Sequence, residues 1–270
     1  MIKKIYPKKR LGQNFLRDEA VVQKIIAAIG PNKNDRIVEI GPGLGALTSE
    51  LLTIVPCLDA IEFDSDMVSA LQNRFGRVLH IHQVDALNFD FSALKNDHRP
   101  LRIVGNLPYN ISTPIIFHLL KYIYLNHTCI ADMHFMLQKE VVDRLIAKHG
   151  NKTYGRLTVM VQYFCEVEFL FSVPPQAFNP VPKVNSSFVR FVPRKNIRLP
   201  VSNLGDLEYL VKQAFNHRRK TIQNCFKGLI TAEQLIELGF DLKLRPEQLT
   251  VDDFVKLSNF YTQTTNLVGN

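Results

Sequence analysis

The chain has 270 residues, of which 46% are hydrophobic, and it carries a formal net charge of +8 at pH 7. This length fits one large domain, or one domain with a small appendage, and the basic balance favours a polyanionic partner such as nucleic acid or an anionic membrane surface. No uncharged apolar run approaches the roughly 20 residues of a membrane span, and no apolar stretch of a secretory signal follows the basic N-terminal residues, so neither a spanning nor an exported protein is expected.

From residue 36 to residue 150, short apolar runs alternate with helical patterns. Strands are expected at residues 36–40, 57–63, 78–84, 101–105 and 133–137, and helices at about 44–54 and 65–75. Strands that alternate with helices in this way are typical of an α/β fold. We therefore predict a doubly wound, Rossmann-like and mostly parallel sheet with right-handed crossovers.

The pattern changes after Gly150, where two β-rich runs follow at 161–171 and 186–192. They flank a proline-rich loop, and their closeness predicts an antiparallel pair at a sheet edge. Only helical signals remain beyond the linker "PRKNIRLP". A helix is expected from a cap at Asp206 to about Lys227, with a stop at Gly228. Capping-box patterns stand at Thr231 with Gln234 and at Thr250 with Asp253. We therefore expect a larger domain at 1–199, beginning with a basic arm at 1–17, and a small helical domain at 200–270.

The stretch "VEIGPGLGALT" joins the first expected strand to the first helix. Gly41, Gly43 and Gly45 let the backbone turn sharply and approach a ligand closely. Their spacing is G-x-G-x-G, whereas the fingerprint of dinucleotide-binding proteins is G-x-G-x-x-G. Ala46 stands at the last position of that fingerprint, where alanine is sometimes allowed, so the spacing does not exclude NAD as the ligand. Glu39, two residues before the first glycine, disfavours a pyrophosphate and suits a cationic or zwitterionic ligand.

Two further acids end the second and third expected strands. Glu62 follows the glycines by about twenty residues, where a carboxylate can accept from both ribose hydroxyls. Asp85 is placed to accept from an adenine amino group. Each acid alone is more often a solvated loop residue, but together with the glycine loop they favour S-adenosylmethionine, with its ribose, adenine and methylsulfonium charge.

The fourth expected strand ends in "GNLPYN". The Asn106 side-chain oxygen and the Leu107 carbonyl, held extended by Pro108, can accept from the two N–H donors of an adenine amino group. The face of Tyr109 can stack on the base. Such a site draws the conjugated nitrogen towards a pyramidal geometry, and it requires a single-stranded or flipped-out base. The alternative is an ordinary turn after a strand.

Basic residues gather in two places that are candidates for RNA binding. They are Lys8, Lys9 and Arg10 in the arm, and Lys212, Arg218, Arg219 and Lys220 in the helical domain. The alternative is a solvated charged face. If these residues contact phosphates, affinity for RNA falls steeply with added salt because bound counterions are released.

These motifs, with "KKRLGQNFL", "PKVNSSF" and "FNHRRKT", resemble the ribosomal RNA adenine N6,N6-dimethyltransferases, and most closely the bacterial small-subunit enzymes. The resemblance runs nearly end to end, with Val181 and Asn185 standing where Pro and Asp are expected. It implies that Asn14, Leu16, Gly41, Glu62, Asp85 and Asn106 contact S-adenosylmethionine. It also implies that Phe178 stacks on the target adenine opposite Tyr109, and that two adjacent adenosines near the 3′ end of small-subunit (16S) rRNA are dimethylated, in late 30S assembly.

Other expectations concern partners and surroundings. The four cysteines, which form no CxxC pair, predict reduced and mostly buried thiols of a cytoplasmic protein without a metal site. The partners expected are small-subunit rRNA and the assembling 30S subunit, with no membrane, and the chain is expected to be a monomer. The alternatives are a large-subunit rRNA adenine methyltransferase, a non-catalytic RNA-binding assembly factor of the same fold and, more distantly, an NAD dehydrogenase.

Overall fold

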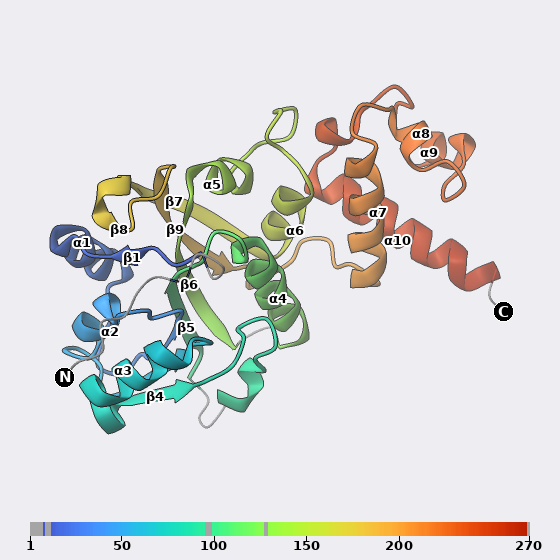
Figure 1. Cartoon of the computed structure of the whole chain (residues 1–270). Coiled ribbons are helices and arrows are strands. Elements are labelled where there is room, and N and C mark those ends of the chain that lie inside the picture. Colours follow the sequence, from blue (N-terminus) through green and yellow to red (C-terminus); the bar gives the residue numbers. More distant parts are fainter. Residues whose placement is uncertain (1–7, 9–11, 95–98, 127–128, 269–270) are drawn as a thin grey trace. The chain divides into compact units, whose positions relative to one another are not determined.

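The computed structural model of the chain, shown in Figure 1, describes residue 8 and residues 12–94, 99–126 and 129–268. The chain divides into two compact units. The first comprises the described residues within 1–142 and 166–193, and the second comprises 143–165 and those within 194–270. The expected boundary near residue 200 differs from this division because 143–165 contains a helix, α6, that packs on helices α7 and α10 of the second unit.

The strands are β1 (Phe15–Leu16), β2 (Arg36–Ile40), β3 (Leu58–Ile61), β4 (Leu79–His82), β5 (Leu101–Asn106), β6 (Ile130–Gln138), β7 (Cys165–Val173), β8 (Phe178–Asn179) and β9 (Ser186–Pro193). The helices are α1 (Glu19–Ile29), α2 (Ala46–Leu51), α3 (Ser65–Phe75), α4 (Ser112–Leu125), α5 (Lys139–Leu145), α6 (Arg156–Phe164), α7 (Leu204–Asn216), α8 (Ile222–Cys225), α9 (Ala232–Glu237) and α10 (Val251–Val268). Short 3₁₀ helices lie at Gly76–Val78, Phe91–Leu94, Pro175–Ala177 and Pro246–Gln248.

Seven of these strands form one sheet in the order β4-β3-β2-β5-β6-β9-β7. The five strands from β4 to β6 are parallel, and β9 runs antiparallel to β6. From β2 the chain continues outward to β3 and β4, and it then returns to β5 on the other side of β2. In Figure 1, α1, α2 and α3 cover one face of the sheet and α4 covers the other. Because the chain leaves β2 on one side and returns on the other, the direction of the strand order changes between β2 and β5. α/β proteins bind ligands at such a point, at the carboxyl ends of the strands.

All five strands predicted between residues 36 and 137 are confirmed, as is the mostly parallel, doubly wound sheet. The prediction for 161–171 is wrong in its first part, because Val161–Phe164 belongs to α6 and the strand β7 begins at Cys165. Seven of the nine residues of α6 are buried. A short helix that is apolar on nearly every side shows no amphipathic period, so it cannot be told from a strand by its pattern.

The helix predicted to run from a cap at Asp206 to about residue 227 is instead two helices, α7 and α8. Asn203, not Asp206, caps α7, since its side chain accepts from the amides of Gly205 and Asp206. The chain leaves the helix after Asn216, where the Lys220 N–H closes a turn on the His217 carbonyl at 2.7 Å. The capping boxes are confirmed at Thr231 with Gln234, which begins α9, and at Thr250 with Asp253, which begins α10.

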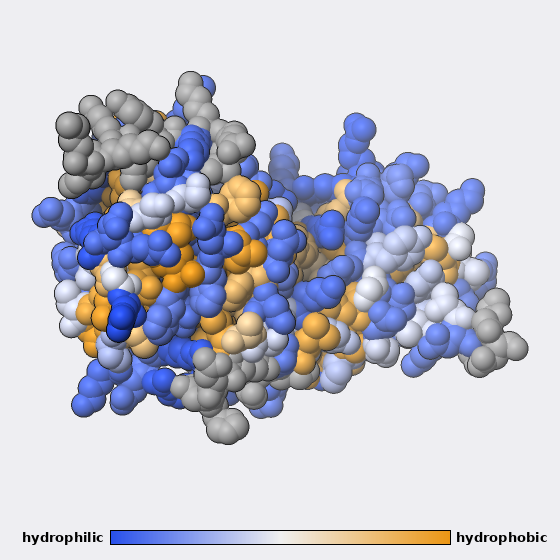
Figure 2. Space-filling view, turned by 60° about the horizontal axis from the view of Figure 1, so that its bottom comes forward, coloured by the Kyte–Doolittle hydropathy of each residue, from blue (hydrophilic) through white to orange (hydrophobic). Residues whose placement is uncertain are grey.

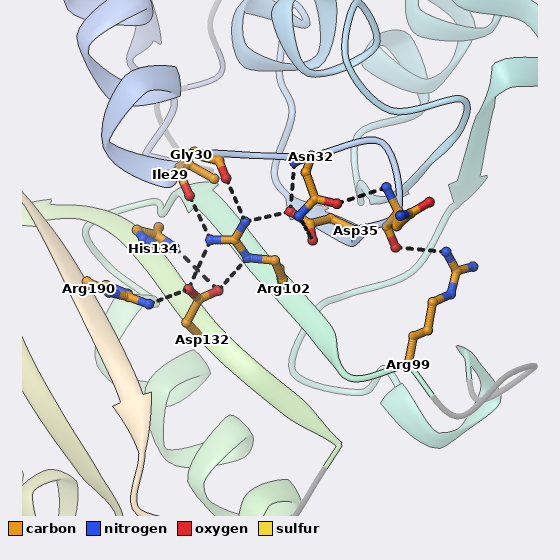
Figure 3. Close-up of polar contacts among 10 residues, drawn as sticks. Ile29, Gly30, Asn32, Asp35, Arg99, Arg102, Asp132, His134 and Arg190 are labelled. Atoms are coloured by element: carbon orange, nitrogen blue, oxygen red, sulfur yellow. Dashed lines mark hydrogen bonds and ion pairs between the residues drawn. The ribbon is translucent and has the colours of Figure 1, made fainter.

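A network of buried charges closes the end of the sheet at which the parallel strands begin (Figure 3). Arg102 on β5 donates to both carboxylate oxygens of Asp132 on β6, at 2.8 and 3.0 Å, and to Asp35 at 2.6 Å. Its guanidinium also donates to the Ile29 carbonyl at the end of α1. Burial alone would raise the pKa of Asp132, but its pairing with Arg102 outweighs this and lowers the pKa. The network thereby joins α1 to the sheet.

Hydrophilic side chains cover most of the face shown in Figure 2, with hydrophobic side chains exposed between them. Of the described helices, none combines the length and the apolar character that a membrane span requires. The cysteines are less uniformly buried than predicted: Cys165 and Cys225 are buried, Cys129 is half-buried and Cys57 is exposed.

Candidate active site

A cavity of about 210 Å³ opens at the carboxyl ends of β2, β3 and β5, where the strand order reverses. Most of the predicted site residues line it: Asn14, Leu16, Gly41, Gly43, Glu62, Asp85, Asn106, Leu107, Pro108 and Tyr109. These residues lie far apart in the sequence, in five separate segments. The sheet brings them together because the carboxyl ends of its parallel strands meet at one edge.

The glycine loop curves around the end of β2. Gly41, Gly43 and Gly45 all have positive φ, a conformation that other residues rarely adopt. The phenyl ring of Phe15 lies so close to Gly43 that an added Cβ would approach it to 3.1 Å. Gly45 is predicted to bind the cofactor, but it lies outside the cavity lining: a Cβ there would meet Phe75 of α3 at 2.7 Å, so this glycine lets α3 pack closely.

Two buried carboxylates line the cavity. Glu62 follows β3 and accepts from the Asp64 backbone N–H at 2.9 Å and from that of Gly43 at 3.4 Å. Glu39 on β2 accepts from the Thr48 hydroxyl at 2.6 Å. Burial raises the pKa of Glu62 above its usual value and raises that of Glu39 to about 7. A hydrogen-bond donor or a positive charge in the cavity would therefore stabilise the ionised form of both acids.

The third predicted acid, Asp85, is half-buried at the cavity wall. One of its carboxylate oxygens accepts from the Leu87 N–H at 2.9 Å, which fixes the direction of the side chain. Asp85 thus lies two strands away from the glycine loop, beyond Glu62, and lines the cavity there.

Asn106, at the end of β5, is oriented by the N-terminal arm. Its side-chain nitrogen donates to the backbone carbonyl of Asn14 at 2.9 Å. An amide whose N–H₂ is engaged in this way presents its oxygen to another donor. The next residue, Leu107, has a buried side chain, whereas Asn106, Pro108 and Tyr109 remain half-buried at the cavity.

The arm is held in place by contacts that the sequence analysis did not identify. Lys8 forms ion pairs with Asp64 and with Asp66, the latter at 2.7 Å, and Gln13 donates to Asp64 at 3.0 Å. Burial alone would raise the pKa of Asp64, but the hydrogen bonds from Lys8 and Gln13 outweigh it and lower the pKa. Lys8, predicted to bind RNA, thus has its charge engaged within the protein. No local pattern in the sequence reveals a pairing across more than fifty residues.

Phe178, predicted to stack on a target base, is only 2% exposed and does not line the cavity. It lies on β8 directly opposite Leu16 of β1, within the hydrophobic core that supports the arm. In this arrangement Phe178 packs in the core rather than facing the cavity.

The predicted basic residues differ in their surroundings. Lys212, Arg219 and Lys220 are exposed on the second unit. Arg218 is half-buried, lies 3.7 Å from the Glu247 carboxylate and donates to the Asn151 carbonyl at 3.4 Å. Lys9 and Arg10 lie outside the described residues. Of the predicted basic residues, Lys212, Arg219 and Lys220 thus face the solvent.

The fold and the cavity define the class of protein. A parallel sheet with one antiparallel strand, a glycine loop after β2 and an acid after β3 are the features of an S-adenosylmethionine-dependent methyltransferase. A family model described as "Ribosomal RNA adenine dimethylase" matches residues 6–263. The chain belongs to this family.

Individual proteins agree with this assignment. The ribosomal RNA small subunit methyltransferase A of Coxiella burnetii (strain Dugway 5J108-111) is 53% identical over 260 residues, which covers 96% of this chain and 99% of the relative. The protein of the same name from Marinobacter nauticus is 51% identical and covers 96% of this chain and 93% of the relative. A dimethyladenosine transferase structure from Plasmodium falciparum is 27% identical with a TM-score of 0.75, covering 93% of this chain and 98% of that one. The 23S rRNA methyltransferase ErmE, at 24% identity and a TM-score of 0.67 over 93% and 100%, shares the fold.

Proposed function

We propose that this chain transfers methyl groups from S-adenosylmethionine to the N6 atoms of adenosines in small-subunit ribosomal RNA. Two adjacent adenosines near the 3′ end, each methylated twice during late 30S assembly, are the proposed target. The observation that best supports the chemistry is the orientation of Asn106, whose nitrogen is engaged by Asn14 and whose oxygen is left as an acceptor. The substrate is inferred from relatives at 51–53% identity that are named as small-subunit methyltransferases.

The cavity fits an S-adenosylmethionine molecule chemically. The glycine loop offers backbone without side chains, Glu62 offers acceptors for ribose hydroxyls, and Asp85 offers one for an adenine amino group. Glu39, which is 2% exposed and bonded only to Thr48 among the hydrogen bonds of the described residues, suits the positively charged end. When bound, the cofactor supplies an electrophilic methyl group on a sulfonium.

The chain's own residues then position and polarise the acceptor nitrogen. The Asn106 oxygen and the Leu107 carbonyl accept from the two N–H donors of the adenine amino group, which draws its lone pair out of conjugation and aims it at the methyl carbon. Tyr109 supports the base by stacking. No strong base is needed before transfer, because the methylated cation is acidic and loses its proton to water or a nearby acceptor. After one methylation a single N–H remains, and the dimethylated product donates to neither oxygen.

The experiment that tests this function uses labelled S-adenosylmethionine with small subunits whose rRNA is unmethylated, followed by mass spectrometry of the RNA. We expect four methyl groups on two neighbouring adenosines. Separate reactions contain naked small-subunit rRNA and large-subunit rRNA. Methylation of the large-subunit RNA alone would indicate the alternative enzyme, and RNA binding without transfer would indicate a non-catalytic assembly factor. Calorimetry with NAD tests the dehydrogenase alternative, because a dehydrogenase would bind this cofactor.

We further propose that Lys212, Arg219 and Lys220 contact RNA phosphates. Their exposure and charge support this role, whereas Lys8 and Arg218 are engaged within the protein. Replacing Arg219 and Lys220 by Gln should weaken RNA binding and reduce the slope of log affinity against log salt by roughly two. Lys33→Gln, an exposed lysine on the first unit, serves as the control. An affinity for RNA that does not change with salt would contradict this part.

A further inference from the structure

The hydroxyl of Tyr109 makes a hydrogen bond of 2.6 Å with the Ser186 hydroxyl. The two residues are 77 positions apart, one in the loop after β5 and the other at the start of β9. Ser186 is fully buried, whereas Tyr109 is half-buried and lines the cavity. A buried serine therefore reaches the far end of the aromatic ring at which a base is proposed to stack.

Both ends of the tyrosine are fixed. At the backbone end, the Ile111 N–H donates to the Pro108 carbonyl at 3.1 Å, and the Ser112 hydroxyl donates to the Tyr109 carbonyl at 3.3 Å. At the ring end, Ser186 holds the phenolic oxygen. A tyrosine side chain has only two rotatable torsions, and the phenolic oxygen lies on the axis of the second. These contacts therefore fix the position of the ring and the direction of its long axis.

Ser186 is itself held by the sheet. It lies opposite Gln138 in the ladder between β6 and β9, and the preceding carbonyl, that of Asn185, accepts from the Lys139 N–H at 3.0 Å. Burial raises the pKa of Tyr109 above its usual value, so the phenol stays protonated near neutral pH and the contact is a bond between two neutral hydroxyls. The anchor is therefore rigid before any ligand enters the cavity.

We infer that Ser186 is a positioning residue for methyl transfer: it presets the position and the long axis of the Tyr109 ring so that an incoming adenine stacks with its amino group at Asn106. This inference rests on the proposed function. A preset ring avoids the loss of side-chain freedom when the base binds, and a tilted ring would displace the amino nitrogen from its two acceptors. The effect of losing the bond should thus appear in turnover more than in cofactor affinity.

The chain offers a closely matched control. Ser187 is the next residue on β9 and is equally buried, but its hydroxyl has no hydrogen-bond partner among the described residues. Ser186→Ala and Ser187→Ala remove the same atom from adjacent positions of one strand. Only the first removes the contact with Tyr109.

The test compares Ser186→Ala, Ser187→Ala, Tyr109→Phe and the Ser186→Ala/Tyr109→Phe double variant in single-turnover methylation of small subunits. We expect Ser186→Ala and Tyr109→Phe each to lower the rate about tenfold, and the double variant to be no slower than either, because both remove one bond. Ser187→Ala should stay within about twofold of the unmodified protein, and calorimetry should show cofactor affinity within about twofold for all variants. Thermal unfolding of each variant identifies any that fails to fold.

Two results would overturn the inference. One is a Ser186→Ala rate equal to that of Ser187→Ala, and the other is a double variant whose loss is the product of the two single losses. For a variant that does not fold, Ser186→Thr replaces Ser186→Ala, and it should keep the rate because it keeps the hydroxyl. If the unmodified protein transfers no methyl group to small-subunit rRNA, the proposed function fails instead, which distinguishes the two failures.

Discussion

The side-chain nitrogen of Asn106 donates to the backbone carbonyl of Asn14 at 2.9 Å, across 92 residues of sequence. The bond places a residue of the N-terminal arm directly against the motif that is proposed to bind the acceptor base. It leaves the Asn106 oxygen as the acceptor. The arm therefore contributes to the candidate site, as an element that sets the direction of the Asn106 amide.

Replacing Asn106 by Ala removes the side-chain oxygen that is proposed to accept from the adenine amino group. We expect this hydrogen bond to be strongest as positive charge develops on the amino nitrogen during methyl transfer. We expect methyl transfer to fall at least about a hundredfold, as when one oriented group of a preorganised polar site is lost. RNA binding, measured by filter retention, should be unchanged, because phosphate contacts dominate that affinity. Unchanged turnover would remove Asn106 from the mechanism.

Replacing Lys8 by Met breaks the ion pairs that tether the arm to Asp64 and Asp66. Because the arm lines the cavity through Asn14 and Leu16, we expect cofactor affinity, measured by calorimetry, to fall severalfold. Lys24→Met is the matched control, since Lys24 lies over the Phe171 ring and forms no ion pair with Asp64 or Asp66. Equal affinities for the two variants would show that the tether does not support the cofactor site.

The affinity for S-adenosylmethionine should depend on pH through Glu39. Burial raises the pKa of Glu39 to about 7, so this acid is largely protonated below that pH in the free protein. A positively charged ligand favours the carboxylate, and affinity should therefore be full above about pH 7.5 and fall by up to about tenfold per pH unit below about 6.5. Calorimetry from pH 5.5 to 8.5 measures it. Glu39→Gln should show a flatter profile, and an unchanged profile would exclude Glu39 as the linked group.

Stability in acid should depend on His134 of β6, which lies beside the Arg102–Asp132 network (Figure 3). Burial lowers the pKa of His134 to about 4, below its usual value near 6.5. The folded protein thus binds this proton less readily than the unfolded chain, and stability is present above pH 6.5 and lost as the pH falls towards 4. The loss amounts to about 3 kcal/mol.

Urea unfolding between pH 7 and pH 4 measures this loss as the difference between the unmodified protein and His134→Leu. The variant should lose less stability over that range. His80→Leu, at a histidine whose side chain is 56% exposed, is the control. Protonation of Asp132 does not affect the comparison over this pH range. Its pKa is lowered in the folded protein, so its contribution to stability is lost only below about pH 4. Parallel curves for the protein and His134→Leu would contradict the assignment.

The fold was largely predictable because its signals are local. The buried strand Arg36–Ile40 and the helix Ser65–Phe75 were predicted at the bounds that the structure has. Helix α6 was missed, since a buried helix and a buried strand share an apolar pattern. The break between α7 and α8 was also missed, because it depends on hydrogen bonds to residues elsewhere in the chain, such as that from Ile222 N–H to the Leu244 carbonyl.

The candidate site was predictable where it follows from strand ends. Gly41, Glu62, Asp85 and Asn106 each follow an apolar run, and parallel strands bring their carboxyl ends to one edge. Gly45 and Phe178 show the limit of this reasoning. Whether a glycine faces a ligand or a helix, and whether a phenylalanine lines a cavity or a core, depends on packing partners that lie far along the chain.

The sequence by itself determined the five parallel strands, the glycine loop and the acids that follow it, because hydrophobic period and turn chemistry act over a few residues. Only the tertiary structure decided how Asn14 meets Asn106, how Lys8 meets Asp64 and how Ser186 meets Tyr109. Each of these contacts joins groups more than fifty residues apart, and their geometry depends on the packing of the sheet and its helices rather than on any local pattern.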